Sequence, residues 1–223
     1  MSREHAFEGT TIRFTSFTDP MSPSPLAPEA RHTYRSGARP MNPLEIAAVV
    51  TTLAAVWLTV RQNIWCWPFA IVGVTLYAVV FYQARLYGNM GLQGVFLALS
   101  IYGWYAWLRG GDDHGTLHVS RVSRIHGLVL SLLGFALAVG LALLFERWTD
   151  AASPRVDSTL TSFSIVAQWM MSRKILENWI VWIAVDVVYV WLFISQSLYL
   201  TAGLYVVFLG LATQGFMEWK RSM

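Results

Sequence analysis

The feature that most constrains this chain is an internal repeat. Residues 61–109 reappear at 173–221, shifted by 112 positions without a gap. Shared apolar composition could align one aliphatic residue with another, but it would not align Trp, Tyr, Gly and Arg so often. The repeated pairs include Arg61/Arg173, Trp67/Trp179, Ile71/Ile183, Tyr77/Tyr189, Phe81/Phe193, Gly103/Gly215, Trp107/Trp219 and Arg109/Arg221. A repeat of this kind inside an apolar chain predicts a membrane protein built from two like halves, as in transporters and channels.

The composition supports a bundle of membrane helices. Hydrophobic residues make up 55% of the chain and charged residues 13%, whereas a soluble domain carries nearly twice that charge. The net charge of +3 is not clustered on one helix face, so we expect no nucleic-acid partner. Cys66 is the single cysteine, which excludes a disulfide framework and a cysteine metal site. We therefore expect the lipid bilayer as the main partner, and no cofactor.

The first 40 residues differ in kind from the rest. They hold five of the eight prolines, many Ser and Thr residues, both signs of charge and no apolar run. A secretory signal would need an apolar segment, so we predict that 1–40 is a disordered tail or an upstream start, with the fold beginning at Met41. The remaining predicted units are a first three-helix repeat at 41–109, a loop and linker helix at 110–150, and a second three-helix repeat at 151–223.

Seven apolar stretches are close to or above the length needed to cross a bilayer, which is about 17–25 residues. The predicted spans are 44–60, 65–84, 90–108, 125–145, 157–172, 177–195 and 198–219. The repeat maps the first three onto the last three and leaves 125–145 as a linker. Three crossings plus the linker start the second half on the same side as the first, so the halves should be parallel repeats. The predicted fold is an all-α membrane protein with seven transmembrane helices in a 3+1+3 order.

The basic residues near the spans predict the orientation. The side of the carboxy terminus carries Arg61, Arg109, Arg121, Arg124, Arg173, Lys174, Lys220 and Arg221. The opposite side carries Arg85, Arg147 and Arg155, and the tail adds Arg31, Arg35 and Arg39. Since positive charge accumulates on the cytoplasmic side, we expect the carboxy terminus in the cytoplasm and the amino terminus outside.

One face of the span 177–195 carries the strongest candidate site. Residues recurring every three or four positions share a helix face, and here they are Trp179, Trp182, Asp186, Tyr189 and Phe193. The first-half equivalent of Asp186 is Val74, so the carboxylate breaks the repeat. A carboxylate inside a span costs roughly 2.5–3.5 kcal/mol on insertion scales and normally faces a cavity or a partner. The pattern predicts a cation site with indole faces beside it; the alternative is a carboxylate that hydrogen-bonds neighbouring helices for packing.

Three glutamines within the spans also break the repeat. Gln93, Gln168 and Gln214 have Tyr205, Val56 and Tyr102 as their repeat partners. An amide both donates and accepts hydrogen bonds, which suits ribose hydroxyls or a carboxamide. Such amides are also common between packed membrane helices, where each hydrogen bond is worth about 0.6 kcal/mol.

Motifs for catalysis and metal binding are absent from the sequence. The five histidines, His5, His32, His114, His118 and His126, all lie in the tail or near the 110–126 loop. His114 and His118 beside Asp112 and Asp113 have a metal-type spacing, but the surrounding glycines favour a solvated loop. There is no P-loop and no Gly-x-Ser-x-Gly motif, so we expect no enzyme and no ATP-driven transport.

Four segments resemble the PnuC family of transporters. The first half supplies NPLEIAAVVTTLAAVWLTVRQNIWCWP and LYGNMGLQGVFLALSIYGWYAWLRGG; the second supplies SFSIVAQWMMSRKILENWIVWIAVDVVYVWLF and LYVVFLGLATQGFMEW. The resemblance covers roughly residues 42–220, and IYGWYAW with ENWIVWIAVD are its most specific parts. It implies an importer of nicotinamide riboside in the bacterial inner membrane, with a fold similar to full-length SWEET sugar transporters.

The resemblance also implies a mechanism and a pocket. The mechanism is facilitated diffusion by alternating access, with the substrate trapped through phosphorylation by a cytoplasmic kinase; the family also allows a homotrimer. The pocket lies between the halves and corresponds here to Trp182, Asp186, Gln93, Gln168, Gln214 and Trp104. The helix face described above adds Trp179 and Tyr189 as candidate binding residues.

Relatives in this family carry thiamine, riboflavin or deoxynucleosides, so the family alone leaves the vitamin open. Nicotinamide riboside and thiamine both contain a flat cationic ring that suits Asp186, whereas neutral riboflavin gains less from a carboxylate. We therefore expect nicotinamide riboside first and thiamine second. The alternatives of a different class are an ion channel or a membrane scaffold. A channel would need polar residues in register along several spans, and here they are concentrated near one depth.

Overall fold

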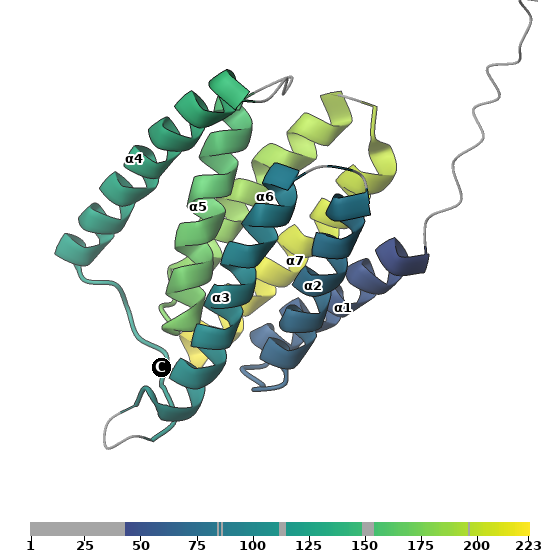
Figure 1. Ribbon diagram of the computed structural model, residues 1–223. Helices are drawn as coiled ribbons and strands as arrows, with labels where there is room; N and C mark the ends of the chain where they lie inside the picture. The colour runs from purple at the N-terminus through teal and green to yellow at the C-terminus, as the bar shows by residue number, and fades with distance from the viewer. Residues whose placement is uncertain (1–42, 84, 86, 112–114, 149–153, 196) are drawn as a thin grey trace, which may run out of the picture. The chain divides into compact units, whose positions relative to one another are not determined.

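The structure is a computed structural model and describes residues 43–83, 85, 87–111, 115–148, 154–195 and 197–223. The predicted tail therefore lies outside the described residues, as do Asp112, Asp113 and His114. The described helices belong to one compact unit, Met41–Met223. They are α1 Pro43–Val60, α2 Cys66–Gln83, α3 Tyr87–Arg109, α4 Arg124–Trp148, α5 Pro154–Ser172, α6 Asn178–Ser195 and α7 Tyr199–Arg221 (Figure 1). Each of the seven predicted segments is thus a helix, with ends within a few residues of the predicted ones.

Five of these helices are long and apolar enough to cross a membrane: α1, α2, α4, α6 and α7. Composition alone does not place α3 and α5 among them, so the predicted count of seven spans is only partly confirmed. In α5 the reason is a run of hydroxyl residues, several of which are buried. Ser162 donates to the backbone oxygen of Ser158 at 2.7 Å, so this polarity is satisfied within the helix.

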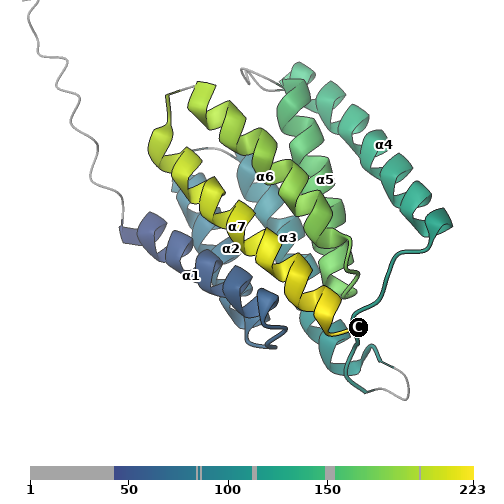
Figure 2. The same cartoon turned by 180° about the vertical axis from the view of Figure 1, so that it is seen from behind.

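Each described helix packs against the next one along the chain, with the exception of α3 and α4. Two further contacts join the halves, because α3 packs against α5 and α1 packs against α7. The linker helix α4 lies alongside α5 (Figures 1 and 2). In both views α3 and α7 run in the same direction, with their carboxyl ends at the end of the bundle where the chain terminates.

The helix ends repeat as the sequence does. Among the described residues, four that are not glycine have positive φ, and they form two pairs 112 positions apart. Gln62 (φ 53°) and Lys174 (φ 49°) end α1 and α5; Arg85 (φ 58°) and Ser197 (φ 60°) end α2 and α6. A residue in this conformation lets the next amides fold back onto the last carbonyls of a helix. The backbone geometry of the repeat is therefore preserved even where its side chains differ.

Four tryptophans form the centre of the core at one end of the bundle. Trp67 and Trp107 meet edge to face with ring centroids 5.3 Å apart, and the repeat-equivalent rings of Trp179 and Trp219 are also 5.3 Å apart. Trp107 and Trp219, which are equivalents of each other, meet at 5.9 Å. The two halves thus contact each other through matching residues.

Hydrogen bonds between the halves are reciprocal. The Trp107 indole donates to the Met171 backbone oxygen at 3.2 Å, and the Trp219 indole donates to that of Thr59 at 3.0 Å. Met171 and Thr59 are themselves 112 positions apart, so α1 and α5 belong to the repeat although their side chains hardly match. The remaining two rings lie over glycines, Trp67 over Gly103 and Trp179 over Gly215, where an added Cβ would overlap the ring.

The loop between α3 and α4 lies against the loop between α5 and α6. Ser120 and Ile175 form an isolated parallel bridge. The Ser120 amide donates to the Lys174 oxygen at 3.0 Å, and the Leu176 amide donates to the Ser120 oxygen at 2.9 Å. Leu117 and Val119 pack against the tryptophan core. Residues 115–123 therefore cover the core at this end of the bundle.

Candidate substrate-binding site

Asp186 is the central group of the candidate site. It lies near the middle of α6 with 5% of its surface exposed. No described residue forms a hydrogen bond or an ion pair with its carboxylate. The packing alternative required hydrogen bonds to neighbouring helices, and the described part of the chain supplies none. A buried carboxylate in this position is a suitable partner for a cationic ligand.

Trp182 lies one helical turn from Asp186 on the same face of α6. It is half-buried and packs against the tryptophan core. Its Nε1 is buried and has no hydrogen-bond partner among the described residues. The face of α6 therefore presents an unpartnered donor and an unpartnered acceptor four residues apart, and buried polar groups of this kind normally have a partner.

Aromatic side chains from α6 and α7 form a cluster within electrostatic range of the carboxylate. Tyr189 stacks on Phe193 with ring centroids 5.8 Å apart. The Tyr205 ring of α7 packs against both, at 4.7 Å from Tyr189 and 5.2 Å from Phe193. Tyr189 and Tyr205 are each close enough to Asp186 to interact with it electrostatically. Tyr189, predicted from the helix face, therefore lies within electrostatic range of the carboxylate and stays a candidate.

Tyr205 was not predicted as a site residue. The sequence carries one signal for it, because Tyr205 is the repeat partner of Gln93, and this pair breaks the symmetry of the repeat. Tyr205 is therefore the aromatic member of a repeat pair whose other member is an amide.

The three predicted glutamines lie on different helices, with Gln93 on α3, Gln168 on α5 and Gln214 on α7. All three are half-buried, and their side-chain amides have no hydrogen bond to another described residue. Two of the helices, α5 and α7, pack directly against α6. The amides remain candidates for contact with a ligand, and a role in joining helices has no hydrogen bond to support it.

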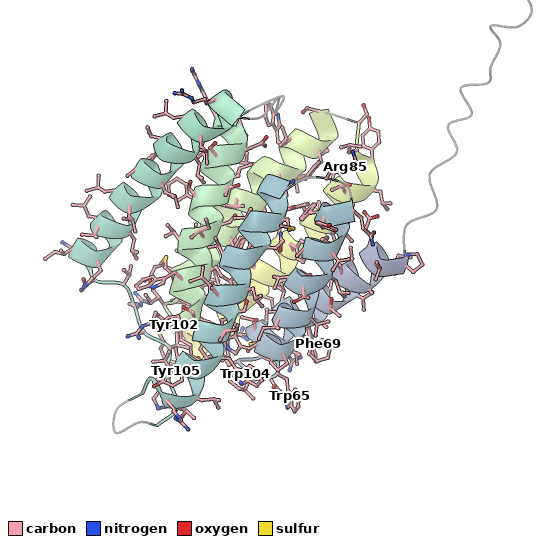
Figure 3. All side chains as sticks on the ribbon, viewed as in Figure 1. Trp65, Phe69, Arg85, Tyr102, Trp104 and Tyr105 are labelled. Atoms are coloured by element: carbon pink, nitrogen blue, oxygen red, sulfur yellow. The ribbon has the colours of Figure 1, made fainter. Side chains whose placement is uncertain are left out.

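Trp104 and Trp179 lie in different surroundings from Asp186. Trp104 is 39% exposed, and Figure 3 places it with Trp65 and Phe69 at one end of α2 and α3. Exposed aromatic rings near a helix end are typical of the boundary between lipid and water. Trp179 is 1% exposed and is enclosed by Gly215 and Trp219. Its surroundings are those of a packing residue.

The described residues hold no group of three or more His, Cys, Asp or Glu side chains that could bind a metal ion. This statement does not extend to Asp112, Asp113 and His114, which lie outside the described part. The candidate groups of the described site are one carboxylate, an indole N–H, tyrosine hydroxyls, glutamine amides and aromatic faces.

Comparison with known families decides the class of the protein. A model of the nicotinamide mononucleotide transporter family matches residues 42–221. The chain belongs to that family. The resemblance to the PnuC transporters noted in the sequence is thereby confirmed, and the protein is a multi-pass membrane transporter of a vitamin-transporting family.

Three similar relatives illustrate the range of the family. The nicotinamide riboside transporter PnuC of Escherichia coli K12 is 26% identical over 212 residues, covering 84% of this chain and 89% of the relative. The riboflavin/roseoflavin transporter RibM of Streptomyces davaonensis is 28% identical over 163 residues, covering 71% and 76%. The nicotinamide riboside transporter PnuC of Neisseria mucosa is 24% identical over 189 residues, covering 80% and 72%.

The fold is similar to that of a solved structure. The crystal structure of the vitamin B3 transporter PnuC superposes with a TM-score of 0.65 and 23% sequence identity, covering 81% of this chain and 83% of the other. This likeness establishes the helical fold. The ligand-binding residues of this chain still have to be argued from its own side chains.

Proposed function

We propose that the protein imports nicotinamide riboside across the bacterial inner membrane by facilitated diffusion. The observation that carries the proposal is the unpartnered carboxylate of Asp186 beside the unpartnered indole N–H of Trp182. Nicotinamide riboside has a positively charged ring for the carboxylate and ribose hydroxyls that accept a hydrogen bond from the indole. One ligand of this kind satisfies both groups, and two relatives are nicotinamide riboside transporters.

The same carboxylate disfavours the phosphorylated form of the substrate. A phosphate near Asp186 adds like charge, and two like charges about 4 Å apart repel by about 4 kcal/mol at an effective dielectric constant of 20. The riboside is therefore preferred over the mononucleotide. Phosphorylation by a cytoplasmic kinase would give a product that the site rejects, so the trapping step predicted from the family suits this site.

Thiamine is the second candidate substrate, because its thiazolium ring is also flat and cationic. The specific observation in its favour is again Asp186, which does not distinguish one ring cation from another. Riboflavin, the substrate in the name of the RibM relative, is neutral and gains less from the carboxylate. We therefore rank nicotinamide riboside first, thiamine second and riboflavin third.

We further propose the 3+1+3 arrangement of seven crossings, similar to SWEET transporters, with α4 as the linker. The reciprocal contacts of Trp107 and Trp219 support this arrangement. In it α3 and α5 cross the membrane with their polar faces against neighbouring helices. Alternating access would then rock one half against the other about the contact between these two rings. The carboxy terminus would face the cytoplasm, and the homotrimer remains a prediction from the family.

Binding of three vitamins to purified variants tests the proposal. Asp186→Asn keeps the shape of the side chain and removes its charge. We expect it to weaken nicotinamide riboside binding ten- to a hundredfold, because a hydrogen bond or contact with a charged group is worth about 1.5–3 kcal/mol. Riboflavin binding should change much less. Calorimetry with nicotinamide riboside, thiamine and riboflavin gives both values.

The control is Trp57→Phe, since Trp57 is 48% exposed and its ring contacts only the Arg61 guanidinium among the described ring and cation contacts. This variant should bind nicotinamide riboside as the wild type does. Equal losses in both variants would remove Asp186 from the site. A wild-type protein that binds none of the three vitamins would overturn the proposed substrates.

A further inference from the structure

The aromatic cluster beside Asp186 has an incomplete copy in the first half. In the second half three rings pack together: Tyr189 and Phe193 stack at 5.8 Å, and the Tyr205 ring lies against both. In the first half Tyr77 and Phe81 stack in the same way, at 6.0 Å and an interplanar angle of 22°. The residue equivalent to Tyr205 is Gln93, so the third ring is missing there.

The incomplete copy lies within electrostatic range of the second half. Tyr205 interacts electrostatically with both Tyr77 and Asp186. Tyr77 of the first half and Asp186 of the second half thus both lie within electrostatic range of Tyr205. Tyr77, Phe81 and Gln93 are all half-buried, so their surfaces are not fully covered by the protein.

We propose that the flat ring of the substrate takes, in the first half, the place that the Tyr205 ring takes in the second. The substrate ring would stack on Tyr77 and Phe81, and its polar substituent would meet the Gln93 amide. Asp186 would supply the negative charge from the opposite half. This inference rests on the proposed function and extends it, because it names which half binds the ring and which binds the charge.

The chemistry of the residues suits a flat ring with an amide substituent. Aromatic faces attract other rings in offset or edge-to-face packing at centroid distances of 4.5–7 Å, the range seen for Tyr205 on its own pair. A glutamine amide can pair with a carboxamide through one donor and one acceptor. Gln93 has no hydrogen bond to another described residue, so its amide is not used to join helices there.

The substitution Gln93→Tyr tests the inference directly. It rebuilds in the first half the arrangement that the second half already tolerates, and the new ring would occupy the place of the substrate ring. We expect nicotinamide riboside to bind at least tenfold more weakly. The matched control is Val95→Tyr, which adds the same side chain at a 42% exposed position two residues away. It should bind as the wild type does.

A second variant covers the case in which Gln93→Tyr does not fold, as judged by its thermal unfolding. Tyr77→Leu removes one face of the stacked pair without adding bulk, and it should also weaken binding at least tenfold. Folded Gln93→Tyr protein that binds nicotinamide riboside with wild-type affinity overturns the inference while leaving the transport function intact. Unchanged affinity in Tyr77→Leu does the same. A wild type that binds no vitamin overturns the proposed function and this inference with it.

Discussion

Lys174 and Gln62, which are repeat equivalents, contact each other across the two halves. The Lys174 Nζ lies 3.5 Å from the Gln62 Oε1 and 4.4 Å from the centre of the Trp107 ring. Both residues have positive φ just after a helix end. A lysine at both positions would place two like charges side by side, so the cation is confined to one half. The repeat is broken here by electrostatics, whereas at Asp186 we propose that it is broken for a ligand.

The buried Lys174 side chain should make the stability of the protein depend on pH. Burial lowers the pKa of Lys174 below its ordinary value of 10.5, an effect that the Cys66 thiol partly opposes. Between the lowered pKa and 10.5 the unfolded chain holds a proton that the folded chain has released, so this residue makes stability rise with pH in that window. Lys174→Gln, which copies the first-half residue, should lack the rise.

Thermal unfolding in detergent between pH 7 and 10.5 measures this difference. Both proteins would carry Cys66→Ser, so that the thiol does not contribute. A constant difference between them over the whole range would show that Lys174 does not titrate within it.

Adding a single methyl group at the glycines beneath the tryptophans should strongly reduce the stability of the protein. A Cβ at Gly103 would overlap Trp67, and one at Gly215 would overlap Trp179. Because a packed core tolerates extra volume poorly, Gly103→Ala and Gly215→Ala should each destabilise the protein by about 1–3 kcal/mol.

The matched controls are another repeat pair on the same two helices. Gly91 and Gly203 have nothing within 4 Å of an added Cβ. Alanine at these positions should be neutral or stabilise the helix by up to about 1 kcal/mol. Thermal unfolding of all four variants compares the pairs. Equal changes at the two pairs would mean that the rings move aside, contrary to the close contact described above.

The four tryptophans of the core should contribute unequally to the stability of the protein. The indoles of Trp107 and Trp219 donate hydrogen bonds between the halves. The indole nitrogens of Trp67 and Trp179 are buried without a described partner. Replacement by Phe removes similar volume at all four positions. The first two variants should therefore lose about 0.5–1.5 kcal/mol more stability than the other two, the usual net value of a hydrogen bond.

Equilibrium unfolding of the four Trp→Phe variants provides the comparison. The loss at Trp107 and Trp219 stays moderate because the acceptor carbonyls keep a second donor; the Met171 oxygen, for instance, also accepts the Lys174 amide at 3.0 Å. A larger loss at Trp67 or Trp179 would show that ring packing outweighs the hydrogen bonds.

The helices and the internal repeat of the sequence could be predicted because each rests on a local signal. Apolar length defines a span without knowledge of its neighbours, and the Trp, Gly and Arg pairs reveal the repeat. The orientation of each helix about its own axis had no such signal. In lipid every face of a helix is apolar, so periodicity tells which residues share a face but not which face points inward.

This limit explains why the surroundings of some candidate residues could be predicted from the sequence and those of others could not. Asp186 was the strongest choice because a charge inside a span carries its own energetic penalty. Trp104 and Trp179 have the same residue type, yet one is exposed and the other enclosed, and nothing in the sequence around them separates these outcomes. Tyr205 becomes visible only when both members of a broken repeat pair are considered.

The loop that covers the tryptophan core forms a hydrogen bond with the side chain of Glu177. A Glu177 carboxylate oxygen accepts the Val122 amide at 2.9 Å and so holds residues 115–123 against the loop between α5 and α6. Hydrogen bonds to a charged group are worth about 1.5–3 kcal/mol. Glu177→Ala should therefore speed hydrogen exchange in 115–123 about ten- to a hundredfold, measured by mass spectrometry. Glu177→Gln keeps an acceptor oxygen and should give a smaller increase. If neither variant exchanges faster, the bridge of Ser120 to Ile175 holds the loop without Glu177.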